Sequence, residues 1–204
     1  MYQISFETLL TRLLSRSEMM SSPEAKKAVQ KEADGWLEKG TWDLSTVTEK
    51  EDLVKRAKKS GIKIHLGQLM SICSEKFAEL AEHLRVLKGR IVFRGDIVKD
   101  QDGNWAVFSE QGTSASHLMA ARFVDAIARF PGMDGEDSDA TGAYTQTVLG
   151  EDCPETWVSL PRDRHPKSWY NADGSCKYDN PVVRLVRNLY GHPLAALYWQ
   201  KFCD

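Results

Sequence analysis

Apolar side chains recur at helical spacing in three stretches of the sequence, as they do along one face of an amphipathic helix. The first stretch, residues 4–17, predicts a short helix. The second predicts a helix over residues 23–39, where a serine pair and a proline provide the start and Gly40 the stop. The third, residues 114–130, is the clearest, and a Pro-Gly pair ends it.

Alternating or short apolar runs predict strands in five further places: near residues 88–98, 104–108, 137–143, 156–160 and 182–187. A shorter strand is expected at 41–44, and Asp102-Gly103-Asn104 is expected to form a turn. Two more helices are expected, a charged one over 49–60 and a final one over 194–202. No stop signal follows the last helix, so we expect the chain to be cut within an element.

The length of 204 residues suits one domain of ordinary size, or a large part of one. The net charge of −2 provides no global basic field, so any nucleic-acid binding must come from a local patch and is expected to be weak and salt-sensitive. The densest basic run is Lys-Arg-Ala-Lys-Lys at 55–59. It is either a solvated helix face or a surface that contacts phosphates.

The cysteines, the apolar runs and the N-terminal residues limit the kind of site, membrane segment and compartment that we expect for this chain. Four cysteines without a Cys-x-x-Cys pair argue against a zinc site and favour a reducing compartment. No apolar run approaches the roughly 20 residues that span a bilayer. Arg12 and Arg16 flank leucines as in a transit peptide, but Glu7 and Glu18 argue against one. We therefore expect an intracellular protein, cytoplasmic or nuclear.

The most informative segment runs from Asp139 to Tyr144, because a carboxylate expected at the end of a strand is followed five residues later by an aromatic ring. A nucleic-acid polymerase uses both: the carboxylate holds a divalent metal ion, and the aromatic packs against the sugar of the nucleotide. The alternative is a surface charge beside a core tyrosine. The nearby Asp137 is a second candidate for the metal ligand, although it lacks an aromatic at the same spacing.

Six segments in order resemble the reverse transcriptase of copia-type retrotransposons. Ser22 to Leu44 is similar to the first helix and strand of that family, which lead into Gly-Thr-Trp. Lys88 to Gly95 is similar to its Lys-Ala-Arg-Leu-Val-Ala-Lys-Gly strand. The other four segments are Phe108-Ser109 with the helix after it, Asp139-Ala140-Thr141-Gly142-Ala143-Tyr144 (family Asp-Val-Lys-Thr-Ala-Phe), Thr156 to Pro161 (Val-Tyr-Met-x-x-Pro), and Arg184 to Trp199 (Arg-Leu-Lys-Lys-Ser-Leu-Tyr-Gly and Arg-Ala-Trp-Tyr).

The resemblance implies an α+β fold: the fingers and first part of the palm of a right-hand polymerase over residues 21–204, behind an N-terminal amphipathic segment at 1–20. It implies RNA-directed DNA polymerisation, a nucleotidyltransferase activity with Mg²⁺ as cofactor. The partners would be a primer–template, a deoxynucleoside triphosphate (dNTP) and the remainder of a polyprotein.

The resemblance also implies roles for individual residues. Asp139 would be the catalytic metal ligand, assisted by the carbonyl of Ala140, and Tyr144 the gate that senses the sugar. Lys88 and Arg90 would contact the triphosphate; they have the same parity on their strand, so the sequence does not show whether that face points into the site. Tyr190 and Gly191 would lie beside the base and the template strand. None of the five histidines shows ligand spacing, and none is assigned a role.

Two departures from the family pattern matter. The residues after Gly191 read His-Pro-Leu-Ala-Ala where the family has Leu-Lys-Gln-Ala-Pro, so the loop of the nucleotide pocket is expected to differ. No Asp-Asp pair occurs, so the Tyr-x-Asp-Asp segment that completes a two-metal site is absent from these 204 residues. The isolated chain is therefore expected to be inactive. Two alternatives stay open: a non-catalytic transposon remnant that binds nucleic acid weakly, and an unrelated α+β interaction module.

Overall fold

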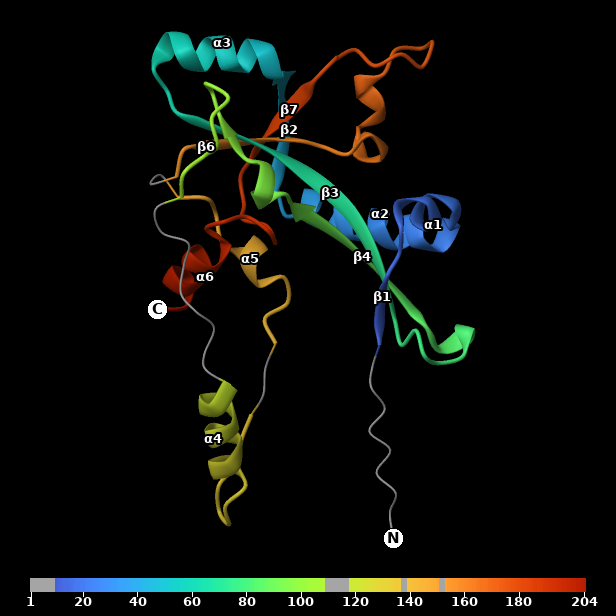
Figure 1. Cartoon of the computed structure of the whole chain (residues 1–204), viewed down its shortest axis with the longest axis vertical. Coiled ribbons are helices and arrows are strands. Elements are labelled where there is room, and N and C mark those ends of the chain that lie inside the picture. Colours follow the sequence, from blue (N-terminus) through green and yellow to red (C-terminus); the bar gives the residue numbers. More distant parts are fainter. Residues whose placement is uncertain (1–9, 109–117, 137–138, 151–152) are drawn as a thin grey trace.

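The computed structural model describes residues 10–108, 118–136, 139–150 and 153–204, and within them the chain is a mixed α/β protein built on one mixed sheet (Figure 1). The path through the sheet is β1-β3-β6-β7-β2, and β4 and β5 also pair with β3. This confirms the α+β class. The strands are β1 Thr11–Leu13, β2 Trp42–Glu49, β3 Ile64–Lys76, β4 Val86–Phe93, β5 Lys99–Asp100, β6 Glu155–Ser159 and β7 Pro181–Leu185. The helices are α1 Arg16–Ser21, α2 Pro23–Glu38, α3 Lys50–Ser60, α4 Leu118–Ala128, α5 Ala143–Gln146 and α6 Ala195–Cys203.

Strand β3 is the centre of the sheet. Its first half pairs parallel with β6 and antiparallel with β5, and its second half pairs antiparallel with β4 and β1. Residues 64–67 are buried one after another, as expected for backbone with neighbours on both sides and layers above and below. No strand was expected at residues 64–76, although β3 organises the sheet.

Helix α2 covers β4, and the residues at its N-terminus determine where it begins. The hydroxyl of Ser22 accepts the N–H of Ala25 at 3.1 Å, and Pro23 occupies the first turn, as predicted. The buried face of the helix meets β4 at Gly89, where a Cβ would lie 2.5 Å from the backbone of Val29. A glycine is therefore required for this helix to approach the strand so closely. That approach fixes the position of Lys88 and Arg90, the two cationic residues on either side of Gly89 in β4.

The core has two parts, both in the described residues. The larger cluster fills the space between α2, β3, β4 and the β6–β7 pair, and includes Val29, Trp36, Ile91 and Phe93. The smaller cluster lies under α3. None of the helices described here has the length and apolar character needed to cross a membrane.

Most predicted elements of the sheet and its helices are confirmed. The helices over 23–39, 49–60 and 194–202 and the strands near 156–160 and 182–187 are present with shifts of a few residues at most. The strand predicted near 88–98 ends at Phe93, and the short strand predicted at 41–44 extends to Glu49.

The helix predicted over 4–17 is wrong for the part of it that the structure describes; residues 1–9 lie outside. Residues 11–13 form β1, and the helix α1 begins at Arg16 with Ser15 as its N-cap. Ser15 accepts the N–H of Glu18, and the Glu18 carboxylate accepts the N–H of Ser15, so a capping box starts α1 at this point. Arg12 pairs with Glu75 of β3 at 3.2 Å, and this ion pair helps to hold residues 11–13 extended against β3.

Two predicted strands are also wrong. In the 104–108 segment only Trp105 makes a bridge, to Lys99, and the backbone bonds of Asp100 N–H to Asn104 and of Ala106 N–H to Val98 flank it, so the chain returns antiparallel but forms no strand there. The 137–143 segment holds no strand at 139–143: a turn leads directly into α5, and residues 137–138, with the candidate Asp137, lie outside the described part.

Helix α4 confirms the described part of the helix predicted over 114–130, while residues 109–117 lie outside. Its apolar stripe does not enter the core: Phe123 is 66% exposed, and Met119 and Phe130 are similarly open. Figure 1 shows the helix projecting away from the sheet. The periodicity correctly predicted the helix but not what its apolar face contacts.

Candidate functional site

Lys88 and Arg90 share one side of β4, opposite Ser74 and Ile72 of β3. Partial burial lowers the pKa of Lys88, and the neighbouring charges of Arg90 and Lys76 lower it further, while Glu32 and Asp139 act in the opposite direction. The ammonium of Lys88 thus lies within electrostatic reach of two other cations and of two carboxylates. Lys88 and Arg90, side by side on one strand, are the candidate phosphate contacts of this site.

Arg90 is held from two sides. Its Nη1 donates to Glu32 Oε1 of α2 at 3.1 Å, and its guanidinium carbon lies 5.9 Å from the centroid of the Tyr190 ring. The side chain is about one-third exposed, so part of the guanidinium still reaches solvent. Glu32 orients Arg90 and partly neutralises it, which leaves Lys88 as the stronger of the two candidate phosphate contacts.

The two tyrosines meet although they are far apart in the sequence. Tyr144 on α5 and Tyr190 after β7 are in edge-to-face contact, with ring centroids 5.0 Å apart and an interplanar angle of 66°. Both are half-buried. Arg90, Tyr190 and Tyr144 therefore form a continuous row of one cation and two aromatic rings, and three of the predicted site residues come together as direct neighbours.

A tight backbone junction positions Tyr190. The N–H of Phe93 donates to the carbonyl of Tyr190 at 2.8 Å, which joins this loop to the end of β4. Gly191 follows with a φ of +87°, and a Cβ there would lie 2.1 Å from the carbonyl oxygen of Phe93. Only glycine fits this position, so the role of Gly191 in the structure is to bring Tyr190 to the cations of β4.

Asp139 is exposed and lies before a turn, not at the end of a strand as the sequence analysis expected. The carbonyl of Ala140 accepts the N–H of Ala143 at 3.2 Å, so it helps to start α5. Asp139 is close enough to raise the pKa of Lys88, which places its charge beside the β4 cations. In the part of the chain described, no group of three His, Cys, Asp or Glu side chains could hold a metal ion.

Sequence reasoning missed Glu32 and Lys76. Glu32 lies three residues after the buried Val29 on α2, so a helical projection would have placed it beside the face that meets β4. Lys76 ends β3, the strand that was not predicted, and only the β3–β4 pairing brings it near Lys88. Strand pairing is non-local, so no spacing in the sequence signalled it.

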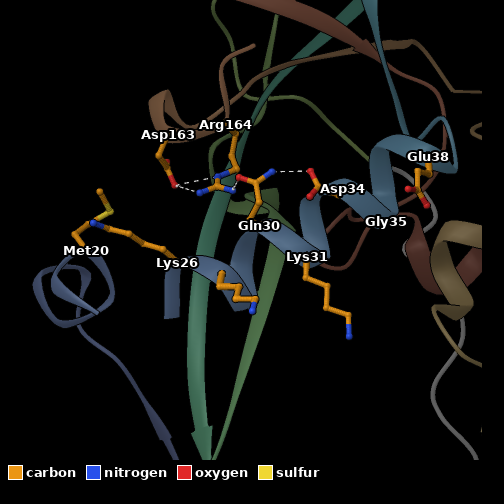
Figure 2. A pocket seen from close by; sticks show the side chains of 10 residues that line it. Met20, Lys26, Gln30, Lys31, Asp34, Gly35, Glu38, Asp163 and Arg164 are labelled. Carbon is orange, nitrogen blue, oxygen red and sulfur yellow. Dashed lines mark hydrogen bonds and ion pairs between the residues drawn. The ribbon is translucent and has the colours of Figure 1, made fainter. Parts of the chain in front are cut away.

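A broad hollow of about 880 Å³ lies elsewhere, on the outer face of α2 (Figure 2). Figure 2 shows a chain of polar contacts along it, from Asp163 through Arg164 and Gln30 to Asp34. These contacts attach the Arg162–Arg164 turn to α2 and satisfy the guanidinium of Arg164. None of the predicted site residues lines this hollow, and its polar groups serve the fold, so size alone does not make it the site.

No protein-family model, curated protein or solved structure matches this chain. The geometry of the residues themselves must therefore support any assignment.

Proposed function

We propose that this chain is the fingers and first part of the palm of a copia-type reverse transcriptase, and that its site binds a deoxynucleoside triphosphate. The observation that supports the proposal is the convergence of Lys88 and Arg90 on β4 with Tyr144 and Tyr190 from two other segments. The cations supply phosphate contacts. The half-buried tyrosines add aromatic surface next to Arg90, and this surface is what a sugar or a base would contact.

The roles follow from the contacts. Lys88, which lies beside Arg90 on β4, binds the triphosphate, and Arg90 assists while Glu32 orients it. Tyr144 senses the sugar, and Tyr190 and Gly191 lie beside the base and the template. The complete enzyme would act in an intracellular compartment on a primer–template, as part of a polyprotein.

The family implies Mg²⁺, but the described carboxylates do not fit a two-metal site. Asp139 is an exposed carboxylate before a turn, and among the residues described no group of three His, Cys, Asp or Glu side chains could hold a metal ion. Two-metal phosphoryl transfer requires carboxylates that hold two ions a few ångströms apart. We therefore assign nucleotide binding to this chain and derive no catalytic step through the metal.

The binding prediction concerns the charge of Lys88. Lys88→Gln is expected to weaken binding of a fluorescent deoxyadenosine triphosphate by roughly tenfold or more, because charge-assisted hydrogen bonds contribute about 1.5–3 kcal/mol. The matched control is Lys31→Gln, an exposed lysine on the outer face of α2, which should bind as the wild type does. Equal affinities of the wild type and Lys88→Gln in a fluorescence titration would refute the proposed phosphate contact.

The sugar role of Tyr144 has a separate readout. The wild type should bind the deoxynucleotide more tightly than the ribonucleotide, and Tyr144→Ala should remove most of that preference. Tyr144→Phe should retain it, since the ring and its contact with Tyr190 remain.

A non-catalytic remnant that binds nucleic acid weakly is the second candidate, and the single exposed Asp139 favours it. Both candidates predict no primer extension by purified 1–204 with Mg²⁺ or Mn²⁺. A product that disappears in Asp139→Asn would contradict this expectation and show that one carboxylate suffices. The downstream reading frame separates the two candidates: a Tyr-x-Asp-Asp segment there marks part of a working enzyme, and an immediate stop codon marks a remnant.

A further inference from the structure

Trp105 is a large aromatic side chain left 60% exposed on a hydrogen-bonded turn. The carboxylate of Asp100 accepts the N–H groups of Asp102 and Asn104 at 2.8 and 2.9 Å, and Asp100 N–H donates to the carbonyl of Asn104 at 2.9 Å. The ammonium of Lys99 lies 3.2 Å from the centroid of the indole. The ring is thus held in place by its turn and a cation but is not buried in the core.

The same turn is attached to the basic end of α3. Lys58 Nζ lies 3.2 Å from Asp102 Oδ1, and the N–H of Ile64 donates to Gln101 Oε1 at 3.2 Å. The exposed Lys63 lines the same hollow as Trp105, and the exposed Lys59 follows Lys58 at the end of α3. The run at 55–59, which the sequence left as either a solvated face or a phosphate contact, therefore adjoins an open aromatic ring.

A hollow of about 250 Å³ lies between these groups. Its walls include Lys63, His65, Trp105, Val107 and Pro154. Asp100 and Gln101 line it as well, and the Asp100 carboxylate accepts the backbone N–H groups of Asp102 and Asn104. Aromatic and apolar walls with Lys63 among the lining residues suit a flat, uncharged ring whose attached groups are anionic. A nucleobase with its phosphate has this chemistry.

We propose that this surface, which we call the Trp105 platform (Lys58, Lys59, Lys63, Lys99 and Trp105), binds single-stranded nucleic acid. A base stacks on Trp105 or enters the hollow beside it, and Lys59 and Lys63 contact the flanking phosphates. Aromatic stacking next to a basic track is the usual means of binding single strands without reading their sequence. The platform is separate from the dNTP site, since it uses neither Lys88 nor Arg90, and so does not rest on the proposed function.

An acidic peptide could also bind the lysines. It would gain little from an exposed indole and a base-sized hollow, so nucleic acid is the occupant that the whole surface favours. The two occupants respond differently to loss of the ring: nucleic acid loses its stacking partner, whereas a peptide held by charge alone does not.

The test is fluorescence anisotropy of the full chain with a labelled oligothymidylate of roughly ten nucleotides at low salt. Trp105→Ala should weaken binding roughly tenfold, the usual loss of one stacked base, and Trp105→Phe should restore most of it. Lys59→Gln combined with Lys63→Gln should reduce the slope of log affinity against log salt by about 1.4, since each phosphate contact to a single strand contributes about 0.7.

Three results would overturn the proposal. The first is an affinity of Trp105→Ala within twofold of the wild type. The second is a labelled polyglutamate bound as tightly as the oligonucleotide. The third is oligonucleotide binding that Lys88→Gln with Arg90→Gln abolishes and Trp105→Ala leaves intact, which would move the single strand to β4. The side chain of Trp105 is mostly exposed, so its variants keep the fold and report on binding alone.

Discussion

Replacing Gly191 by alanine is expected to lower the free energy of unfolding by about 3 kcal/mol or more, because two effects add. The backbone has a φ of +87°, which side chains other than glycine adopt only with strain, and the new Cβ would lie 2.1 Å from the carbonyl oxygen of Phe93. The junction between the Tyr190 loop and β4 would have to open. Urea unfolding at pH 7 measures the loss.

Gly103→Ala is the matched control, since Gly103 has nearly the same φ, +84°, but open space around it. It should show only the conformational cost, about 1–2 kcal/mol. The difference between the two variants isolates the close approach to Phe93. Similar losses in both would mean that the backbone at residue 191 can shift away from β4 easily, and that Gly191 does not position Tyr190.

Acidification from pH 7 to pH 5 is expected to lower the free energy of unfolding by about 2 kcal/mol through His192. Burial lowers the pKa of His192 to about 4, with a further contribution from His65. Unfolding restores an ordinary pKa near 6.5, so between these values the unfolded chain binds more protons than the folded one. The contribution of neutral His192 to stability is therefore fully present above pH 6.5, falls as the pH drops below that value, and is fully lost below about pH 4.

The site around His192 explains this cost. The ring packs 4.9 Å from Phe93 and 6.0 Å from Phe108, between centroids, and its Nε2 is buried without a partner among the described residues. Its Nδ1 accepts the N–H of Leu194 at 3.2 Å, which requires the neutral ring. Burial also lowers the pKa of His65, so that residue adds a loss of the same sign.

Urea unfolding at pH 7, 6 and 5 tests the effect, and the slope with pH is the readout. His192→Asn should flatten the slope even if it lowers stability overall, whereas exchange of the exposed His83 for glutamine should leave it unchanged. Hydrogen bonds with Arg12 and Ser15 lower the pKa of Glu18 to about 2, so its contribution is lost only at more acid pH. A slope as steep in His192→Asn as in the wild type would assign the effect to other groups.

The elements that the sequence predicted best are those whose signals are local. The cap at Ser22, Pro23 in the first turn and the buried stripe through Val29 specify α2 within a single segment. The 139–143 segment failed because its extended appearance depended on a partner strand that the fold does not provide. The spacing of residues in the sequence cannot show which strands pair with each other. Strand β3, which pairs with four other strands, was therefore not predicted.

The candidate site shows the same division. The parity of Lys88 and Arg90 was readable from the strand pattern, but what they face was not, since it depends on Glu32 from α2 and Tyr190 from beyond β7. The contact between Tyr144 and Tyr190 joins two segments that only the completed fold brings together. Asp139 was expected at the end of a strand, and this was wrong because residues 139–143 have no partner strand in the fold.

The pairing of β2 with β7 has a consequence for the order in which the protein forms during synthesis. Trp42 lies opposite Leu185, so β2 leaves the ribosome long before its partner has been translated. The β3–β4 hairpin is nearly local and can form early, whereas β2, which pairs with β7 at the end of the sheet, has no strand partner until β7 emerges. Such distant pairings make folding slow, on the order of milliseconds to seconds, and expose the waiting strand to aggregation.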